Sequence, residues 1–488
     1  MFDDTIAAIA TPLGEGGLAV VRISGPQAFA IADKCFLPVG KNSRKPSLAT
    51  SHTIHYGRII RGYPGAPASS RPTVAPKQDL RRQDAVVPGD APYQVIDEVL
   101  LAVLRAPRSY TCEDTVEITC HGGILPAKLV LDTVLENGAR LAGPGEFTRR
   151  AFLNGRLDLV QAEAVADLIH SRTELALAAA SEQLAGKLSQ RINELRDEMV
   201  KTLAHVEAHI DFPDEDIAPD TQEQLLQRLE AGVTFMDKLL QTANEGRILR
   251  RGIRAAIVGR PNVGKSSLLN QLLGHDRAIV SPIPGTTRDT IEETANIRGL
   301  PVVFIDTAGL REARDEIEQE GIRRSHETVT RAEFVLHVLD ASEALTDEDQ
   351  KFLDAFAGKK RIMIRNKVDL PNKLSEFRVP NADSRIVDVC CLSGQGIESL
   401  KDAIKEQIWR GEIGSEMLEV MINSRHQEAL NRARGAMQRA IELLRNNATL
   451  ELVALDLRIG VSAVGEIVGK TATEDLLDCL FGQFCIGK

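Results

Sequence analysis

Short apolar runs alternate with turns along the first third of the chain. Residues 18–23 and 95–104 are rich in Val, Ile and Leu, which is typical of strands. Residues 124–136 predict a helix that ends at an Asn-Gly pair. Residues 61–92 hold mostly Pro, Gly, Ala, Ser and Arg, with too little apolar content to pack, so we interpret them as a flexible surface insertion. We expect residues 1–155 to form an α+β domain.

The spacing of apolar residues changes at about residue 156. Residues 157–210 are rich in Ala, Leu, Glu and Gln with an apolar period near that of a helix, which predicts one long amphipathic helix or a pair. A second helical stretch covers residues 221–249, and helical sequence resumes at about residue 417. Helical sequence on both sides predicts that the intervening domain is inserted into a helical one, although two unrelated helical segments are the alternative. The expected divisions after the first domain are residues 156–250, 251–410 and 411–488.

Short apolar runs, each followed by polar or helical sequence, lie between the helical stretches. This alternation is expected of a parallel sheet with helices on both faces. The predicted strands are residues 253–258, 302–305, 334–339, 361–364 and 386–389. Ligands of such sheets bind at the carboxyl ends of the strands. The residues that follow each run are therefore the candidates for chemistry.

The segment after the first of these strands carries the clearest motif. Residues 259–266 read Gly-Arg-Pro-Asn-Val-Gly-Lys-Ser, which fits G-x-x-x-x-G-K-[ST]. In such a loop the backbone N–H groups converge on phosphate oxygens, Lys265 adds positive charge, and the Ser266 hydroxyl can bind magnesium. A helix predicted from about Ser267 would add its N-terminal dipole.

Two further motifs follow strands of the same predicted sheet. Residues 306–309, Asp-Thr-Ala-Gly, can hold magnesium through Asp306 and approach a γ-phosphate through the Gly309 N–H. An ordinary turn is the weaker alternative. Residues 366–369, Asn-Lys-Val-Asp, place a carboxylate that can accept the two parallel N–H donors of guanine, which adenine lacks. Asp369 therefore predicts selectivity for GTP.

The loop between the first helix and the second strand can sense the third phosphate. Residues 284–289, Pro-Gly-Thr-Thr-Arg-Asp, can supply a threonine hydroxyl to magnesium and a mobile segment that responds to the γ-phosphate. Ras-like enzymes carry a glutamine after the Asp-x-x-Gly motif that orients the attacking water. Here Leu310 stands in that place and can form no hydrogen bond through its side chain. The order of motifs resembles the translation-factor-related GTPases, and we predict a GTPase that recruits another group or a cation for hydrolysis.

Composition narrows the class of protein. The 488 residues, 43% hydrophobic and 26% charged, suit a soluble protein of about three domains. A net charge of −10 argues against non-specific coating of nucleic acid. Seven cysteines without C-x-x-C spacing indicate neither a disulfide framework nor a zinc site. No apolar run approaches the roughly 18 residues of a membrane span, and the acidic start Met-Phe-Asp-Asp fits no signal peptide. We expect a cytoplasmic protein without a membrane segment.

Motifs along the whole chain resemble the MnmE (TrmE) family of bacterial tRNA modification GTPases. Besides the motifs at 259–266, 284–289 and 306–312, the chain ends Phe-Cys-Ile-Gly-Lys at 484–488, which P-loop GTPases generally lack. Further matches lie at residues 16–17, 22–25, 121–123, 144–148, 150–154 and 211–215. The main segment without a match to the family is residues 61–92.

The resemblance implies a multidomain protein that combines α/β and all-α parts. Its parts would be an N-terminal α+β domain that binds folate and forms a homodimer, a helical domain, and an inserted Ras-like P-loop GTPase domain. The family works with the FAD-dependent protein MnmG as a heterotetramer, and together they add an aminomethyl or carboxymethylaminomethyl group to carbon 5 of the wobble uridine of certain tRNAs. A reduced folate, 5-formyl- or methylenetetrahydrofolate, supplies the one-carbon unit. GTP hydrolysis drives conformational change, and it is fast only when GTPase domains pair around potassium.

The resemblance also assigns roles in the nucleotide site. Magnesium would be held by Ser266 and Thr287, and potassium by Asn262, Ser281, Ile283 and Thr286. The catalytic residues would be Lys265, Thr287, Asp306 and Glu318. The GTP-binding residues would be Asn262, Val263, Gly264, Lys265, Ser266, Ser267, Ser281, Pro282, Ile283, Pro284, Gly285, Thr286, Thr287, Asp306, Thr307, Ala308, Gly309, Asn366, Lys367, Asp369, Ser393 and Gly394. Asn262 could instead cap its own turn, and Glu318 lies in an acidic run that is equally typical of a solvated surface. The family usually has Ser-Ala where this chain has Ser393-Gly394.

For folate, the resemblance points to Arg22, Glu117, Arg156 and Lys488. The donor–acceptor edge of a pterin suits a carboxylate, and the glutamate tail of a folate suits cations. Without the resemblance, Arg22 and Glu117 would be surface ends of strands. Cys485 is a candidate nucleophile for one-carbon chemistry, and a packed or merely positional thiol is an equally good interpretation.

Other classes of function remain open from the sequence. A ribosome-assembly GTPase switch is the first alternative, but no basic RNA-binding module adjoins the GTPase motifs. A folate-dependent metabolic enzyme with a regulatory GTPase is the second. Only 4% of residues are aromatic, which leaves few platforms for stacking bases, so tRNA contact would depend on the partner or on Lys and Arg.

Overall fold

Contacts divide the chain into two units in the computed structural model, which describes residues 2–40, 44–62, 93–211, 222–274, 292–305, 331–356, 358–374, 385–409 and 415–488. One unit comprises residues 1–163 together with residues 471–488, and the other comprises residues 164–470. The last helix, α17 (Glu474–Phe481), therefore belongs with the N-terminal residues rather than with the helices that precede it.

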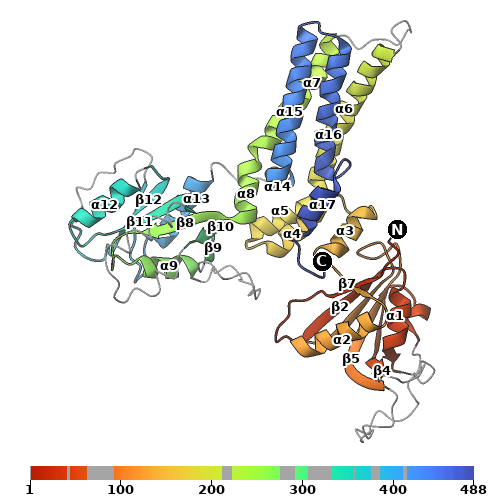
Figure 1. The fold of residues 1–488 in the computed structure, drawn as a ribbon. Coiled ribbons are helices and arrows are strands. Elements are labelled where there is room, and N and C mark those ends of the chain that lie inside the picture. Colours follow the sequence, from red (N-terminus) through yellow and green to blue (C-terminus); the bar gives the residue numbers. More distant parts are fainter. Residues whose placement is uncertain are drawn as a thin grey trace, which may run out of the picture. The chain divides into compact units, whose positions relative to one another are not determined.

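A seven-stranded sheet forms the centre of the first unit (Figure 1). Its order is β3-β4-β5-β6-β2-β1-β7, and its strands are β1 Ile6–Ile9, β2 Leu18–Ser24, β3 Phe36–Pro38, β4 Thr53–Gly62, β5 Tyr93–Leu104, β6 Thr115–His121 and β7 Arg140–Leu141. Helices α1 (Ala28–Cys35) and α2 (Ile124–Glu136) bury their apolar sides on one face of it. The predicted strands at 18–23 and 95–104 and the predicted helix at 124–136 are confirmed, whereas most of the predicted insertion lies outside the described residues.

The described residues of this unit cover the other face of the sheet only toward one end. Side chains alternate between the two faces of a strand, and Val21 and Ile23 of β2 point into the core beneath α1 and α2, so Arg22 points away from it. A smaller apolar cluster on the β1 side contains Phe147 of α3 (Glu146–Leu153). On the β4–β5 side, Ile54 and Leu100 stay exposed.

A buried arginine joins three segments of this unit. The guanidinium of Arg150 is fully buried and donates to Asp4 at 2.7 Å, to Glu146 at 3.0 Å and to Glu113 at 3.3 Å. Glu113 also accepts a hydrogen bond from Ser24 at 2.7 Å. A buried charge needs such partners, because an unpaired ion in the interior costs several kcal/mol, on the order of 3–5.

Helices dominate the start and end of the second unit. They are α4 Leu159–His170, whose first turn belongs to the first unit, α5 Glu174–Leu184, α6 Lys187–Asp211, α7 Gln222–Gln241, α8 Ala243–Arg251, α14 Ser415–Glu419, α15 Ser424–Arg445 and α16 Leu450–Val468. The long helices α6, α7, α15 and α16 lie side by side, with α16 against both α15 and α6 (Figure 1). Since two of these helices precede the α/β segment and two follow it, that segment is inserted into one helical domain, as predicted.

The helix count predicted for residues 157–210 was wrong. The stretch forms three helices rather than one or two, because polar residues and a glycine interrupt it. Thr173 caps α5 by accepting from the Ala176 N–H at 3.2 Å, and Gly186 takes a positive φ of 87° before α6. The stretch at 221–249 is similarly divided at Thr242.

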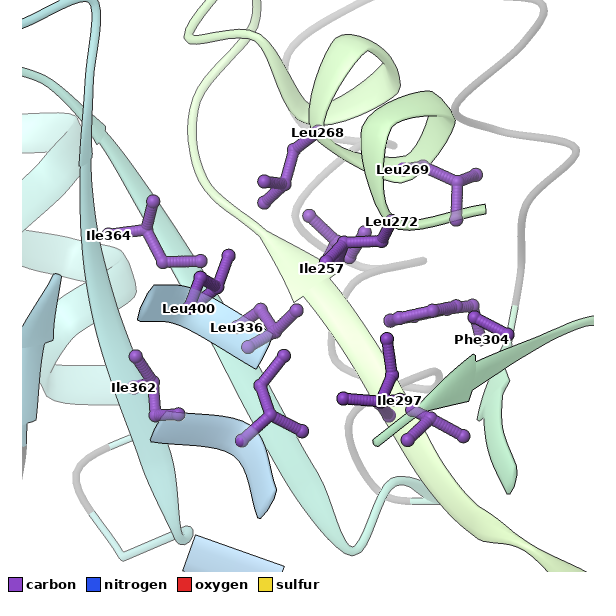
Figure 2. Close-up of a cluster of buried hydrophobic side chains, with 14 of the residues drawn as sticks. Ile257, Leu268, Leu269, Leu272, Ile297, Phe304, Leu336, Ile362, Ile364 and Leu400 are labelled. Atoms are coloured by element: carbon purple, nitrogen blue, oxygen red, sulfur yellow. The ribbon is translucent and has the colours of Figure 1, made fainter. Parts of the chain in front are cut away.

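A six-stranded sheet forms the inserted α/β segment. Its order is β13-β12-β11-β8-β10-β9, with β8 Ile253–Val258, β9 Glu293–Ile297, β10 Leu300–Phe304, β11 Phe334–Asp340, β12 Arg361–Asn366 and β13 Arg385–Asp388. Helices α9 (Lys265–Leu273) and α13 (Ile397–Ile408) cover one face, and α12 (Asp347–Ala355) covers the other. Figure 2 shows Leu268, Leu269 and Leu272 of α9 beside the strand residues Ile257 and Leu336.

One strand departs from the predicted parallel sheet. β9 runs antiparallel to β10 and was not predicted. Arg298 and Gly299 connect the two strands with φ of 55° and 88°, as in the two-residue turns that favour hairpins. The other neighbours in the sheet are parallel, as expected.

Candidate active site

The phosphate-binding motif forms the loop between β8 and α9. Its backbone uses left-handed conformations at Asn262 and Gly264, with φ of 64° and 99°. A Cβ on Gly264 would stand 2.2 Å from Nδ2 of Asn366, and a Cβ on Gly259 would stand 2.3 Å from the carbonyl oxygen of Val338. Both glycines are therefore required for the loop to close against the sheet.

Lys265 is mostly buried at the start of α9. Its Nζ donates to the carbonyls of Gly259 and Arg260, each at 2.8 Å. Burial lowers the pKa of this ammonium to about 8, against a small opposing attraction from Glu348. The group thus sits in a place where its charge is poorly solvated, and the phosphates of a nucleotide would neutralise it.

The predicted guanine-binding segment is fastened to the phosphate loop. Asn366 is buried, its Nδ2 donates to the carbonyl of Val263 at 2.8 Å, and its Oδ1 accepts from the Cys391 N–H at 3.2 Å. Gln271 of α9 donates to the carbonyl of Cys391 at 2.8 Å. Three segments that are distant in sequence therefore meet at one edge of the sheet. Both hydrogen bonds of the Asn366 amide are made to the protein itself.

An acidic residue of this edge was not predicted from the sequence. Asp340, the last residue of β11, binds Nζ of Lys367 at 2.6 Å. Burial opposes ionisation of Asp340, but hydrogen bonds from Lys367 and Ser342 outweigh it and hold the pKa of this carboxyl below its ordinary value. The sequence did hold one indication of this residue, because Asp340 comes directly after the apolar run of a predicted strand. It belongs to none of the nucleotide-binding motifs, so the motifs did not identify it.

The remaining described residues of the site are more exposed. Asp369, Ser393 and Asn262 are exposed, and Gly394 takes a positive φ of 79°. Thus the structure brings the phosphate loop, residues 366–369 and residues 393–394 to the carboxyl edge of one sheet. The predicted residues Ser281, Pro282, Ile283, Pro284, Gly285, Thr286, Thr287, Asp306, Thr307, Ala308, Gly309 and Glu318 lie outside the described residues.

These residues fit a magnesium-bound nucleoside triphosphate. The loop offers a glycine cradle that a Cβ would fill, and among the described residues no carboxylate hydrogen-bonds to its buried lysine. Ser266, the second residue of α9, would hold magnesium and the backbone N–H groups would hold phosphate.

A second polar site lies on the first unit. Arg22 of β2 stands directly opposite Glu117 of β6, and its Nε donates to Glu117 at 2.8 Å. Arg22 also donates to the carbonyl of Gly487 at 3.4 Å. Burial and the neighbouring Arg22 guanidinium hold the pKa of Lys488 below its ordinary value, although Glu117 and Cys485 pull it upward. The structure therefore brings Arg22, Glu117 and Lys488 together, and the thiol of Cys485 is exposed.

Tyr110 links this cluster to the fourth predicted residue. Arg156 donates to the carbonyl of Tyr110 at 2.7 Å, and its guanidinium carbon lies 5.0 Å from the centre of the Tyr110 ring. The guanidinium carbon of Arg22 lies 5.4 Å from the same ring. Sequence reasoning missed Tyr110, because an isolated aromatic residue in a loop carries no periodic or motif signal.

Models of two protein families match this chain. "GTP-binding protein TrmE N-terminus" matches residues 5–156, and "MnmE helical domain" matches residues 159–485. The tRNA modification GTPase MnmE of Geobacillus kaustophilus is 46% identical over 99% of both chains. That of Thermoanaerobacter pseudethanolicus is 43% identical over 100% of both, and that of Bacillus subtilis is 44% identical over 99% of this chain and 100% of its own.

The α/β segment with its glycine-bounded phosphate loop is a Ras-like P-loop GTPase domain, and the protein is a GTPase. It is inserted in a helical domain that follows an α+β domain. The chain belongs to the MnmE family of tRNA modification GTPases. The resemblance and the fold class predicted from the sequence are thereby confirmed. No helix among the described residues combines the length and the apolar content that crossing a bilayer requires.

Proposed function

We propose that this protein hydrolyses GTP with magnesium at the phosphate loop and that hydrolysis serves the modification of tRNA. The observation that carries the proposal of a nucleotide site is the hydrogen bond from Nδ2 of Asn366 to the carbonyl oxygen of Val263, at 2.8 Å. It fixes the predicted guanine-binding segment to the phosphate loop. A ligand that spans both would bind a guanine at one end and a triphosphate at the other. Family membership supports the tRNA part.

Each residue of the proposed nucleotide site has a separate role. Lys265 binds outer phosphate oxygens, and Ser266 with Thr287 would hold magnesium. Thr287, Asp306 and Glu318 complete the proposed catalytic set. Leu310 offers no hydrogen bond to the attacking water, so we propose that Asn262, Ser281, Ile283 and Thr286 bind potassium when two GTPase domains pair. When bound, the two cations supply positive charge beside the β- and γ-phosphates.

Exchange of monovalent cations tests the potassium site. GTP turnover should fall at least about tenfold when KCl is replaced by NaCl at equal ionic strength, if the cation supplies transition-state charge. Asn262→Ala should lower turnover in KCl and leave little difference between the two salts. Asn262→Gly is the matched variant, because it keeps the left-handed backbone but also lacks the side-chain oxygen. Equal rates of the wild type in both salts would remove potassium from the mechanism.

Asp369 provides a separate test of the nucleotide. Asp369→Asn removes the carboxylate that accepts both guanine N–H groups, and preference should shift from GTP toward xanthosine triphosphate by on the order of 10–100-fold. Competition binding of the two triphosphates measures this. Lys351→Ala, an exposed change on α12 of the same domain, is the control. Unchanged preference in Asp369→Asn would place guanine elsewhere.

The second site supports a reduced folate as the one-carbon donor. Arg22 and Lys488 neighbour the carboxylate of Glu117, and Arg156 shares the ring of Tyr110 with Arg22. A pterin edge could hydrogen-bond to Glu117, while the carboxylates of a folate tail would balance the excess positive charge. We further propose that an FAD-dependent partner of the MnmG type completes the reaction at carbon 5 of the wobble uridine. Cys485 is near enough to this cluster to influence Lys488, which keeps it a candidate for one-carbon chemistry.

Nucleoside analysis tests the pathway as a whole. Removal of the gene should abolish the carboxymethylaminomethyl or aminomethyl group on wobble uridine, read by mass spectrometry of digested tRNA. An Arg22→Ala copy should restore little modification, whereas a copy with Lys128→Ala, an exposed change on α2, should restore it fully. An unchanged nucleoside profile together with GTP-dependent ribosome co-sedimentation would favour a ribosome-assembly GTPase instead.

A homodimer is proposed for the first unit. The face of the sheet that α1 and α2 leave uncovered carries Ile54, Tyr56 and Leu100, which are 69%, 45% and 46% exposed. Tyr56 and Leu100 stand directly opposite each other in the β4–β5 ladder. Apolar side chains grouped in this way favour burial against a second copy. Ile54→Asp with Leu100→Asp should halve the mass measured by sedimentation, and Leu48→Asp should not; a monomeric wild type would contradict the proposal.

A further inference from the structure

The ring of Tyr110 contacts two cations that are far apart in the sequence. The guanidinium carbons of Arg22 and Arg156 lie 5.4 Å and 5.0 Å from the ring centre, both inside the roughly 6 Å range of cation–π attraction. Arg22 comes from the middle of β2, and Arg156 comes from the turn after α3. No hydrogen bond joins the two arginines among the described residues, so the shared ring is the contact they have in common.

Tyr110 is itself held on several sides. Its hydroxyl lies 2.9 Å from Oγ1 of Thr148, which is buried on α3. Its carbonyl accepts from Arg156, and the next carbonyl, that of Thr111, accepts from Asn154 at 2.7 Å. The loop that carries the ring is thus fastened to α3 through backbone and side chain. A ring held in one orientation can in turn hold the guanidinium groups that pack against it, those of Arg22 and Arg156.

The phenol contacts the arginines as a neutral group. Burial raises the pKa of Tyr110 despite the opposing effects of Thr148, Arg22 and Arg156. At neutral pH the ring therefore offers the negative face of its quadrupole rather than a phenolate charge. A neutral ring does not compensate the charge of either arginine, which leaves that charge to pair with an anion. Within the described part of the chain, Glu117 forms an ion pair with Arg22 and not with Arg156.

We propose that Tyr110 is a positioning residue, whose ring holds the guanidinium groups of Arg22 and Arg156 at the spacing that binds the carboxylates of a folate-class ligand. This inference rests on the folate site proposed above. Arg side chains carry about 2 kcal/mol of rotamer entropy, so a surface that orders them before binding increases affinity. Without the ring, the exposed Arg156 guanidinium would keep, among the contacts of the described residues, its hydrogen bond to the Tyr110 carbonyl.

Calorimetric titration of the full chain with 5-formyltetrahydrofolate tests this inference. Tyr110→Leu should weaken binding about tenfold, the loss of roughly 1.4 kcal/mol of cation–π and ordering energy. Tyr110→Phe keeps the ring and should bind within a factor of about three. Tyr93→Leu is the control, because Tyr93 lies at the end of β5 in the same sheet. GTP turnover and the melting temperature of each variant check that the chain still folds.

A ligand without carboxylates separates positioning from direct contact. Methyltetrahydropterin offers the reduced pterin alone, so Tyr110→Leu should lose its effect on this ligand while keeping it on the folate. Equal losses on both ligands would show that the ring stacks on the pterin and would overturn the inference. So would a Tyr110→Leu variant that binds folate like the wild type, or a Tyr110→Phe variant as weak as Tyr110→Leu.

NMR of the arginine side chains tests the geometry without any ligand. The Nε–H signal of Arg156 should carry a ring-current shift that disappears in Tyr110→Leu and persists in Tyr110→Phe. The Arg22 signal should change in Tyr110→Leu but keep a contribution from Phe147, whose ring centre lies 5.6 Å from its guanidinium carbon. Unchanged signals in Tyr110→Leu would overturn the inference whatever the ligand proves to be. If instead the wild type binds no folate while these shifts are present, the folate proposal fails and the positioning role of Tyr110 stands for a different anion.

Discussion

The nucleotide pocket and the basic cluster of the first unit are built in opposite ways. In the pocket, one contiguous loop between β8 and α9 supplies backbone donors, a lysine and a serine. In the basic cluster, single side chains arrive from β2, β6, the loop before β6, the turn after α3 and the end of the chain. A site made of backbone depends on conformation and hence on glycines, whereas a site made of side chains depends on the neighbours that orient each one.

The largest expected effect comes from the pocket. Lys265→Ala should lower GTP turnover by on the order of 10²–10³-fold, because it removes the buried charge that we propose to pair with the phosphates. Binding of 5-formyltetrahydrofolate should remain unchanged, since the two sites share no residue. Phosphate release and calorimetry measure the two activities, with Lys351→Ala as the control.

A loss of folate binding in Lys265→Ala would break the comparison. It would mean that folate binding by the first unit requires an intact nucleotide site. The two sites would then be coupled rather than independent.

An intermediate effect is expected in the basic cluster. Arg22→Ala should weaken binding of 5-formyltetrahydrofolate by about 10–100-fold, the loss of a charge-assisted hydrogen bond worth roughly 1.5–3 kcal/mol. GTP turnover should keep its wild-type value. Lys128→Ala removes an exposed cation on α2, which covers the opposite face of the sheet, and should leave both activities intact. Equal weakening by both changes would show that net charge, not the cluster, attracts the ligand.

The smallest effect concerns stability rather than a site. His337 of β11 is fully buried in the nucleotide domain, and burial, with a contribution from Arg361, lowers its pKa to about 3. The unfolded chain takes up this proton below about pH 6.5, whereas the folded domain does not, so falling pH removes stability. The loss should reach about 2 kcal/mol between pH 6.5 and 5.

Urea unfolding at the two pH values measures this loss. His337→Leu and His337→Gln cannot titrate, so both should show a smaller decrease than the wild type. A wild-type slope retained in both variants would assign the acid sensitivity to other groups. The result sharpens the contrast within one domain. Burial lowers the pKa of both His337 and Lys265, but His337 is neutral at neutral pH, whereas Lys265 lies in the phosphate loop, where a nucleotide would pair with its charge.

Sequence reasoning worked best where a residue's neighbours in the chain are also its neighbours in space. The helix at 124–136 and the loop at 259–266 fall in this class, because helix ends and glycine spacing are local. The hairpin at Arg298–Gly299 was missed since its short strand β9 carries few apolar signals. Tyr110 and Asp340 were missed for a different reason. Their roles come from contacts with residues elsewhere in the chain, which no local pattern encodes.

The division of residues 157–210 shows the same limit on a smaller scale. Apolar periodicity continues almost unbroken across Thr173 and Gly186, so it indicates helix throughout. A single cap and a single left-handed glycine decide that the chain turns instead. Periodicity reports which residues face a core, and it says little about where the axis changes direction.

The guanidinium of Arg150 has a practical consequence for anyone who shortens this protein. One of its nearest counter-charges, Asp4, stands only four residues into the chain. Trimming those residues would remove one of the three carboxylates that compensate this buried cation of α3, the helix that also anchors Tyr110. Tags and truncations at that end should therefore be chosen with the same care as a change in the interior.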